Sequence, residues 1–223
     1  PRTTFDVAVL DGTTETEVER QGHGFQRTLL ISALQLLAQS GAASAEGVIC
    51  LAIEEPELFQ HPTQAQTFAK VLRSLAEDTG KRIQVTYATH SPYFLEAQHF
   101  DQIRRLTRSS DEIPLVTVHL ATAADVKDKL NGVMSNNKVD SQLDNIVANQ
   151  LGVSLFAQRA FLVEGPTESS VFYGIGDKVS QGSLEAAGVS IVAVGGKSSI
   201  PLVHAILTSI GIPVYALFDS DAG

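Results

Sequence analysis

The sequence predicts an α/β protein, in which strands and helices alternate and parallel strands form open sheets. The first observation is the alternation itself: apolar runs of strand length are followed by longer segments that carry apolar residues at helical spacing. The second is that three apolar runs end abruptly in acidic residues, as in LAIEEPELFQHP over residues 51–62. Strands of an open parallel sheet are covered on both faces and carry their ligand sites at their carboxyl ends, which gives this pattern.

The first half of the chain contains more expected strands than helices. The strands expected there are residues 5–10, 48–53, 83–88, 103–106 and 115–120. The helices expected there are residues 26–39 and 63–79, the second of which Gly80 ends. A polar loop rich in threonine and glutamate is expected after the first strand. Residues 125–151 are polar, helical in pattern and low in aromatic residues, which indicates a connector.

A second α/β pattern begins after this connector. Its expected strands and helices, in chain order, are residues 161–164, 167–179, 189–194, 198–210 and 214–219. The sequence stops directly after the last of these strands, where a complete domain rarely finishes. We therefore expect the chain to be part of a longer protein.

Composition excludes several classes of protein. The longest apolar stretch, residues 28–38, is interrupted by polar residues and falls short of the roughly 20 residues that a membrane helix needs. No secretory signal is visible at the N-terminus. The single cysteine, Cys50, excludes an internal disulfide framework and argues against structural zinc. These features predict a cytoplasmic protein without a membrane partner, and the net charge of −9 argues only mildly against binding nucleic acid.

Two adjacent glutamates, Glu54 and Glu55, follow the apolar run at residues 48–53. Adjacent carboxylates repel each other, so a functional site would hold both only where a cation offsets the repulsion or one carboxylate handles a proton. A Walker B strand has this arrangement: Glu54 would hold Mg²⁺ through water, and Glu55 would polarise the attacking water. The alternative is a solvated turn that Pro56 punctuates.

Two other stretches carry residues suited to phosphate. In YATHSPYFL, residues 87–95, His90 follows a strand and could reach a γ-phosphate, although a histidine that only completes a turn is the alternative. In GHGFQR, Gly22 and Gly24 precede a helix with Gln26 in its first turn. Glycines before a helix N-terminus can form an anion site from backbone N–H groups, and an ordinary glycine loop is the alternative.

Together and in this order, the three stretches resemble the ATP-binding-cassette (ABC) type ATPase head of DNA-repair and chromosome-maintenance proteins. IEEPELFQHP resembles its Walker B motif and D-loop, ATHS its switch histidine, and GHGFQR a divergent form of its signature motif. The resemblance implies ATP as a cofactor and a nucleotide site that includes Glu54, Glu55, His90, Gly22, Gly24 and Gln26. Because the signature acts on nucleotide held by a partner head, it also implies a homodimer or higher homo-oligomer through the heads.

No phosphate-binding loop of the form G-x-x-x-x-G-K-[ST] occurs upstream of Glu54. AVGGKSSIP, residues 193–201, is a tempting substitute, but the spacing requires a glycine where Ile191 lies inside an expected strand. We interpret Gly195 and Gly196 as a tight turn beside another site, and Lys197 as a candidate contact to a phosphodiester.

The second half carries four acidic residues near expected strand ends. FLVEGPTE ends a strand on Glu164 and places Glu168 in the first turn of the next helix. ALFDSDAG sets Asp219 and Asp221 two residues apart, on one side of an extended chain. We expect the four carboxylates to converge at one sheet edge, where oxygen-only ligands favour Mg²⁺ or Mn²⁺. For the Asp-Ser-Asp stretch alone, the alternative is a solvated loop.

These carboxylates resemble the metal site of the Toprim domain, which topoisomerases, primases and certain nucleases share. VEGPTE, VGGKSSIP and FDSDAG in this order look most like the overcoming lysogenization defect (OLD) family, which fuses an ABC-type ATPase head to Toprim. The resemblance implies the C-terminal part of such a head followed by a Toprim (Rossmann-like) α/β domain. The expected boundaries are residues 1–120 for the head, 121–155 for a helical connector and 156–223 for Toprim.

The OLD resemblance implies an ATP-linked, divalent-metal-dependent DNA endonuclease that acts in phage defence or DNA repair, with a helicase-type or other defence protein as a further partner. The catalytic and metal-binding residues that it implies are Glu54, Glu55, Glu164, Glu168, Lys197, Asp219 and Asp221. Two alternatives stay open: a non-catalytic ATPase scaffold that clamps DNA, and a Toprim component of a topoisomerase or primase. The latter needs a nucleophilic tyrosine module or a nucleotide-transfer site, and neither is recognisable in the sequence.

Overall fold

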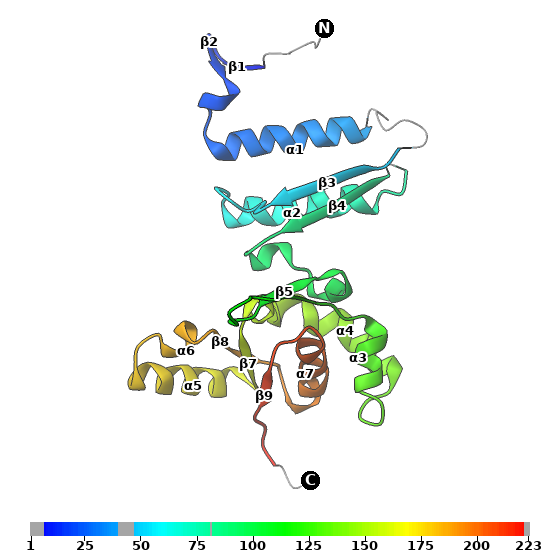
Figure 1. The fold of residues 1–223 in the computed structure, drawn as a ribbon, viewed down its shortest axis with the longest axis vertical. Helices are drawn as coiled ribbons and strands as arrows, with labels where there is room; N and C mark the ends of the chain where they lie inside the picture. Colours follow the sequence, from blue (N-terminus) through cyan, green and yellow to red (C-terminus); the bar gives the residue numbers. More distant parts are fainter. Residues whose placement is uncertain (1–6, 40–46, 81, 221–223) are drawn as a thin grey trace. The chain divides into compact units, whose positions relative to one another are not determined.

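The chain has a mixed α/β structure with two parallel sheets, which confirms the predicted fold class (Figure 1). The computed structural model describes residues 7–39, 47–80 and 82–220. Its contacts divide the chain into two compact units, Pro1–Phe94 and Leu95–Gly223. Each unit buries a hydrophobic cluster of its own. No helix in the described part of the chain is long and apolar enough to cross a membrane.

The first unit alternates strands and helices after an N-terminal hairpin. Its elements are β1 (Ala8–Asp11), β2 (Thr14–Glu17), η1 (Val18–Arg20), α1 (His23–Gln39), β3 (Ile49–Glu54), α2 (Pro62–Glu77), β4 (Ile83–Ala88) and η2 (Pro92–Phe94). The prediction of a polar loop after the first strand is wrong in part, because Thr14–Glu17 pairs with β1 as an antiparallel strand. Gly12, with a φ of +59°, makes the tight turn between the two.

Strands β3 and β4 pair in parallel, with Ile49 opposite Ile83 and Glu54 opposite Ala88. Side chains alternate in exposure along both strands, so the pair buries one face and leaves the other exposed. The expectation that helices cover both faces is therefore wrong for this pair within the described residues. The exposed face carries small and polar side chains, Cys50, Ala52 and Glu54 among them, which do not need burial.

Helix α2 covers the buried face of this strand pair. Pro62 stands at its first position, where a missing N–H costs nothing, and the Gln64 side chain accepts a bond from the His61 backbone N–H at 3.4 Å. Its buried residues recur at helical spacing and are Ala65, Phe68, Ala69, Leu72 and Leu75. Burying a side chain as large as Phe68 or Leu72 contributes about 1.5–3 kcal/mol, so this face anchors the helix.

The second unit begins after Phe94 and contains more elements. They are η3 (Ala97–Gln102), β5 (Arg105–Arg108), β6 (Val116–His119), α3 (Ala123–Lys129), α4 (Asn136–Gln150), η4 (Ser154–Phe156), β7 (Arg159–Val163), α5 (Pro166–Val179), α6 (Ser183–Ala186), β8 (Val189–Ala193), η5 (Lys197–Ser199), α7 (Ile200–Ser209) and β9 (Val214–Ala216). The helical stretch expected at residues 125–151 is split into α3 and α4. Gly132, with a φ of +80°, lies in the turn that separates them.

Strands β7, β8 and β9 form a parallel sheet in the order β8-β7-β9. Leu162 of β7 packs in the core with residues of α7, whereas Phe161 meets the ring of Phe172 on α5, with centroids 4.8 Å apart. Because neighbouring side chains of a strand point to opposite faces, α5 and α7 cover opposite faces of the sheet. The carboxyl ends of the three strands lie at one edge, as the sequence predicted.

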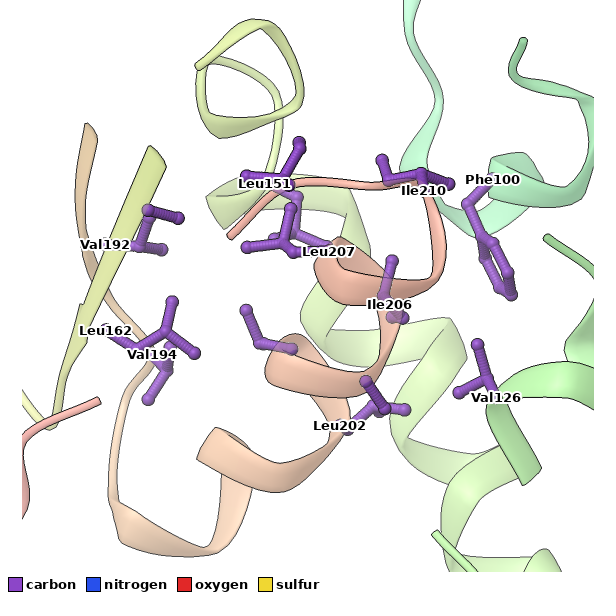
Figure 2. Packing of buried hydrophobic residues seen from close by; sticks show 14 of the residues in the cluster. Phe100, Val126, Leu151, Leu162, Val192, Val194, Leu202, Ile206, Leu207 and Ile210 are labelled. Atoms are coloured by element: carbon purple, nitrogen blue, oxygen red, sulfur yellow. The ribbon is translucent and has the colours of Figure 1, made fainter. Parts of the chain in front are cut away.

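One continuous core joins this sheet to the helices that precede it. Figure 2 shows Leu162 and Val192 of the sheet and Ile206 and Leu207 of α7 in the same cluster as Val126 of α3. Phe100, Leu151 and Leu155 belong to it too. The helices of the expected connector therefore fold as part of the same compact unit as the sheet, because their few apolar residues are buried against α7 and β7.

The β5–β6 hairpin attaches to this unit through its polar face. Arg105 donates from Nη1 to the backbone oxygen of Gly211 at 3.0 Å and from Nη2 to that of Ala157 at 3.4 Å. Partial burial lowers the pKa of this guanidinium, which nonetheless stays charged. On the same face, His119 Nε2 lies 2.8 Å from the Thr107 hydroxyl. Through Arg105, the hairpin is therefore hydrogen-bonded to backbone oxygens in the turns that border the sheet.

Candidate functional site

The two predicted glutamates lie where β3 ends. Glu54 is the last residue of β3, and the backbone N–H of Glu55 donates to the oxygen of Ala88 on β4 at 2.8 Å. Glu54 is exposed, whereas Glu55 is half-buried and has a φ of +45°, which is uncommon for a residue other than glycine. The positive φ of Glu55 therefore marks a sharp turn of the backbone directly after the strand.

His90 lies beside the second glutamate. Its Nε2 atom is 3.8 Å from Oε1 of Glu55, and its side chain is 85% exposed. The parallel pairing of β3 and β4 brings these residues together, because both follow the carboxyl ends of neighbouring strands. An exposed imidazole next to a carboxylate can reach a ligand that enters from solvent.

Glu57 is a third glutamate that the sequence analysis did not single out. Its carboxylate accepts a bond from the Thr89 hydroxyl at 2.8 Å and a second from the His90 backbone N–H at 2.8 Å. The signal was present in the sequence, since Glu57 follows the strand end by three residues in IEEPE. Its partners could not be read there, because they lie more than thirty residues along the chain in a different loop.

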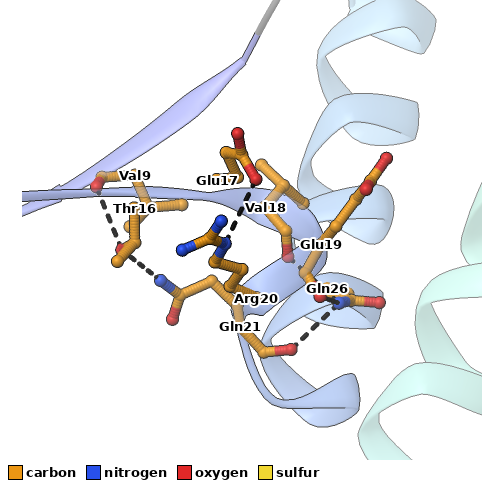
Figure 3. Close-up of polar contacts among 8 residues, drawn as sticks. All are labelled: Val9, Thr16, Glu17, Val18, Glu19, Arg20, Gln21 and Gln26. Carbon is orange, nitrogen blue, oxygen red and sulfur yellow. Dashed lines mark hydrogen bonds and ion pairs between the residues drawn. The ribbon is translucent and has the colours of Figure 1, made fainter.

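The expected signature-like segment forms the start of α1. The helix begins at His23 rather than at Gln26, because the backbone N–H groups of Phe25 and Gln26 already donate to the oxygen of Gly22. Figure 3 shows that the Gln26 amide turns back to the preceding loop, where Nε2 donates to the oxygens of Val18, Glu19 and Gln21 at 3.0, 3.2 and 2.9 Å. A nucleotide contact by Gln26 stays a prediction, and its Oε1 atom would have to make it.

The first turn of α1 also meets the turn after β3. The ring of His23 stacks on that of Phe59 with centroids 4.5 Å apart. A Cβ atom on Gly24 would lie 3.5 Å from the backbone oxygen of Phe59, an ordinary van der Waals distance, so the two segments are close neighbours here. The signature-like and D-loop-like segments are thus in direct contact, and the expected roles of Gly22 and Gly24 in nucleotide binding stay predictions.

The second site lies where β7, β8 and β9 end. Glu164 directly follows β7, and its Oε1 atom accepts a bond from the backbone N–H of Asp219 at 2.7 Å. The Asp219 backbone oxygen accepts a bond from Lys197 Nζ at 2.7 Å, and this ammonium lies 5.3 Å from the centre of the Phe218 ring. Glu164 therefore binds the backbone N–H of Asp219, and Lys197 binds its backbone C=O.

The turn before Lys197 is tight, as the sequence predicted. Gly195 and Gly196 both have positive φ angles, 77° and 127°, and the N–H of Gly196 donates to the backbone oxygen of Glu164 at 2.9 Å. A short 3₁₀ turn at Lys197–Ser199 follows, and α7 begins directly after it at Ile200. The turn thereby places Lys197 beside Glu164.

One of the four expected carboxylates, that of Glu168, is engaged in a different contact. Glu168 turns back on its own helix, where its Oε2 atom accepts a bond from the Gly165 N–H at 3.0 Å. Asp221 lies outside the described residues. Within residues 7–39, 47–80 and 82–220, no group of three or more histidine, cysteine, aspartate or glutamate side chains is gathered closely enough to hold a metal ion. Glu164 and Asp219 are the expected acidic residues that the structure brings together.

The acidic residues at this edge carry the oxygen ligands that a hard cation prefers, and their use as metal ligands stays a prediction. Glu164 and Asp219 offer carboxylate oxygens, and the Oε1 bond of Glu164 leaves its second oxygen for a metal ion. Glu168 is in the first turn of α5, where its carboxylate caps the helix, and its role as a metal ligand stays a prediction. Lys197 supplies the positive charge that a phosphate group would meet there.

Comparisons with known proteins match each half of the chain to a domain family. The family described as AAA ATPase domain matches residues 3–95, and the family described as overcoming lysogenization defect protein-like, TOPRIM domain matches residues 155–221. The Old nuclease of Escherichia phage P2 is 28% identical over 208 residues, which cover 92% of this chain and 34% of that protein. The OLD nuclease of Thermus scotoductus is 27% identical over 208 residues, which cover 90% of this chain and 35% of that protein.

The chain spans about a third of the length of the curated relatives that it matches. The two matched segments follow each other in the order expected from the motifs, with the ATPase first and Toprim second. The chain therefore combines an AAA ATPase domain with an OLD-like Toprim domain, and over most of its length it is related to proteins named OLD nuclease.

Proposed function

We propose that this chain is part of an ATP-linked, divalent-metal-dependent DNA endonuclease of the OLD type. The observation that carries the proposal is the bond between Glu164 Oε1 and the Asp219 N–H, which brings together two acidic residues that follow different strands of one sheet. A nuclease site at the carboxyl edge of a Toprim-type sheet needs this convergence. The relatives named OLD nuclease support the same assignment.

In this proposal, Glu164, Glu168, Asp219 and Asp221 hold Mg²⁺ or Mn²⁺. The metal ions would activate water and stabilise the leaving oxygen of a phosphodiester. Glu164 and Lys197 keep the Asp219 peptide in place from its N–H and its C=O ends. Lys197 orients the strand end, and its charge attracts the DNA backbone.

The ATPase part of the proposal rests on the pair of Glu55 and His90. Glu54 would hold the Mg²⁺ of ATP, Glu55 would polarise the attacking water, and His90 would sense the γ-phosphate. We assign Gly22, Gly24 and Gln26 to the surface that closes on nucleotide bound by a partner head, so the working form is a homodimer or higher homo-oligomer.

The biological setting that we propose is the cytoplasm, in phage defence or DNA repair, with a helicase-type or other defence protein as a further partner. We also propose, as divisions of the sequence, residues 1–120 for the head, 121–155 for the connector and 156–223 for Toprim, whereas the compact units of the structure divide between residues 94 and 95. Both parts of this proposal rest on the resemblance to OLD proteins.

A specific observation favours one alternative, a DNA-clamping ATPase scaffold without nuclease activity. The Glu168 carboxylate caps its own helix at Gly165 instead of joining Glu164, so the acidic cluster is incomplete in the described residues. A scaffold of this kind would bind DNA in response to ATP and leave its phosphodiester bonds intact.

A plasmid-nicking assay with the full-length protein separates the two functions. The proposal expects supercoiled DNA to be converted to nicked circles in Mg²⁺ or Mn²⁺, and expects EDTA to stop the reaction. ATP-dependent DNA binding with no nicking in either metal ion would support the scaffold instead.

A further inference from the structure

The turn that follows β3 has a strained backbone. Glu55 and Phe59 both have positive φ angles, 45° and 62°, in a region that residues other than glycine rarely adopt. Such conformations persist only where surrounding contacts fix the backbone, and they are frequent at switches and active sites. The contacts that this turn makes therefore indicate its function.

Contacts fix the turn at both of its strained residues. The Glu55 N–H donates to the Ala88 oxygen at 2.8 Å, and the Leu58 N–H donates to the Glu55 oxygen at 3.0 Å. At the other strained residue, the Phe59 ring stacks on His23. Glu57 lies between Glu55 and Phe59 in the sequence, so these contacts also fix the backbone that carries it.

Glu57 uses this position to hold a different loop. Both of its carboxylate oxygens are engaged, Oε2 by the Thr89 hydroxyl and Oε1 by the His90 N–H, each at 2.8 Å. The Thr89 oxygen in turn accepts a bond from the Ser91 N–H at 3.0 Å, so the network continues along the loop. Bonds to a charged acceptor are roughly twice as strong as neutral ones.

The consequence is a fixed place for His90. Its backbone is held by Glu57, and its ring then lies with Nε2 at 3.8 Å from Glu55 Oε1, although the ring itself is exposed. We infer that Glu57 is a positioning residue of the ATPase site, whose carboxylate holds the loop at Thr89 and His90 so that His90 faces Glu55. This inference rests on the proposed ATPase function of Glu55 and His90.

Three variants of the full-length protein test the role of Glu57. Glu57→Ala removes both bonds. Glu57→Gln retains both, because its amide oxygen accepts from the His90 N–H and the Thr89 hydroxyl can rotate to accept from its amide nitrogen. Glu77→Ala is the matched control, an exposed glutamate of α2 that pairs with Arg73 at 3.1 Å.

For Glu57→Ala we expect kcat for ATP hydrolysis to fall about 10-fold or more, as for other groups that orient a functional side chain, with KM nearly unchanged. Glu57→Gln should retain most of the wild-type kcat, and Glu77→Ala should match wild type. Two outcomes would overturn the inference. One is a Glu57→Ala kcat equal to that of Glu77→Ala, and the other is an equal loss in Glu57→Gln, which would mean that the charge itself is needed at the nucleotide.

A double variant asks whether Glu57 acts through His90. If it does, Glu57→Ala should lower kcat no further in a protein that already carries His90→Ala. Multiplied losses would show that the two residues act separately, and would contradict the positioning role.

Hydrogen exchange separates this inference from the proposed function. The inference expects the His90 amide to exchange faster in Glu57→Ala than in wild type or Glu57→Gln, whether or not the protein hydrolyses ATP. If wild type shows no ATPase activity but exchange at His90 changes as expected, the proposed function fails and the loop contact stands. If exchange is unchanged while wild type is active, the positioning role fails alone.

Discussion

Glu168 and Asp219 illustrate how far single residues could be predicted. Both were expected at the same metal site, because the sequence places each of them near a strand end. The structure brings Asp219 to Glu164 but lets Glu168 cap its own helix, a local bond that costs little to form. Strand ends are visible in sequence, whereas the choice between a local cap and a distant ligand depends on side-chain rotamers.

The metal-binding role of Asp219 gives a prediction on stability. Acidic side chains at one edge repel each other, so Asp219→Asn should leave the melting temperature of the metal-free protein unchanged or slightly higher. Mg²⁺ at a hundredfold excess over its dissociation constant should stabilise wild type by about 2.7 kcal/mol, and should stabilise Asp219→Asn far less. Thermal melting with and without Mg²⁺ measures both, and an identical Mg²⁺ response in the two proteins would speak against Asp219 as a ligand.

His90 gives a second prediction at this scale. Because its side chain is 85% exposed, His90→Ala should barely change the melting temperature of the full-length protein. The same change should lower ATP turnover, since the ring that faces Glu55 is lost. A large fall in melting temperature with normal turnover would instead assign His90 to the fold.

At the scale of elements, the predictions succeeded where apolar periodicity is strong. Strand β4 and the end of α5 fall where the sequence predicted them, since Ile83–Ala88 and Val179 were the expected limits. The hairpin strand β2 was missed because its TETE sequence is polar on both faces. Its pairing comes from the turn at Gly12 rather than from burial, and hydrophobic patterning carries no signal of that kind.

The attachment of the β5–β6 hairpin depends on Gly211. This glycine has a φ of +76°, and a Cβ atom there would collide with the His119 ring. Gly211→Ala should therefore destabilise the protein by about 1 kcal/mol or more, measured by urea unfolding. Gly132→Ala is the control, because its φ of +80° imposes similar strain with nothing within 4 Å of the added atom. Equal losses in the two variants would mean that the His119 contact is unimportant.

At the scale of the whole molecule, the sequence predicted two α/β parts in series but gave less information on what lies between them. The expected connector is polar, and its few apolar residues, such as Val126 and Val139, are buried in the core that also contains Leu162. Burial of so few residues over a long polar stretch gives a weak periodic signal. The core that unites residues 95–220 could therefore be found only in three dimensions.

The motif content of the sequence leads to a prediction for the 223-residue chain by itself. It carries Glu54 and Glu55 but no G-x-x-x-x-G-K-[ST] loop, so it should hydrolyse ATP at a negligible rate. Phosphate release from the purified chain measures this. Turnover that Glu55→Gln abolishes would contradict the prediction, and would direct attention to the Gly-Gly-Lys turn at residues 195–197.

The central claim is that one protein carries a nucleotide site at Glu55 and a separate DNA-cleaving metal site at Glu164 and Asp219. The most direct measurement determines nicking and ATP turnover side by side in full-length wild type, Glu55→Gln and Asp219→Asn. We predict that Glu55→Gln slows ATP turnover about 10²- to 10⁴-fold, as expected for loss of a positioned base, and that Asp219→Asn abolishes nicking while ATP turnover stays at the wild-type rate. Nicking by Asp219→Asn at the wild-type rate, with the usual metal dependence, would contradict the claim and place the nuclease site elsewhere.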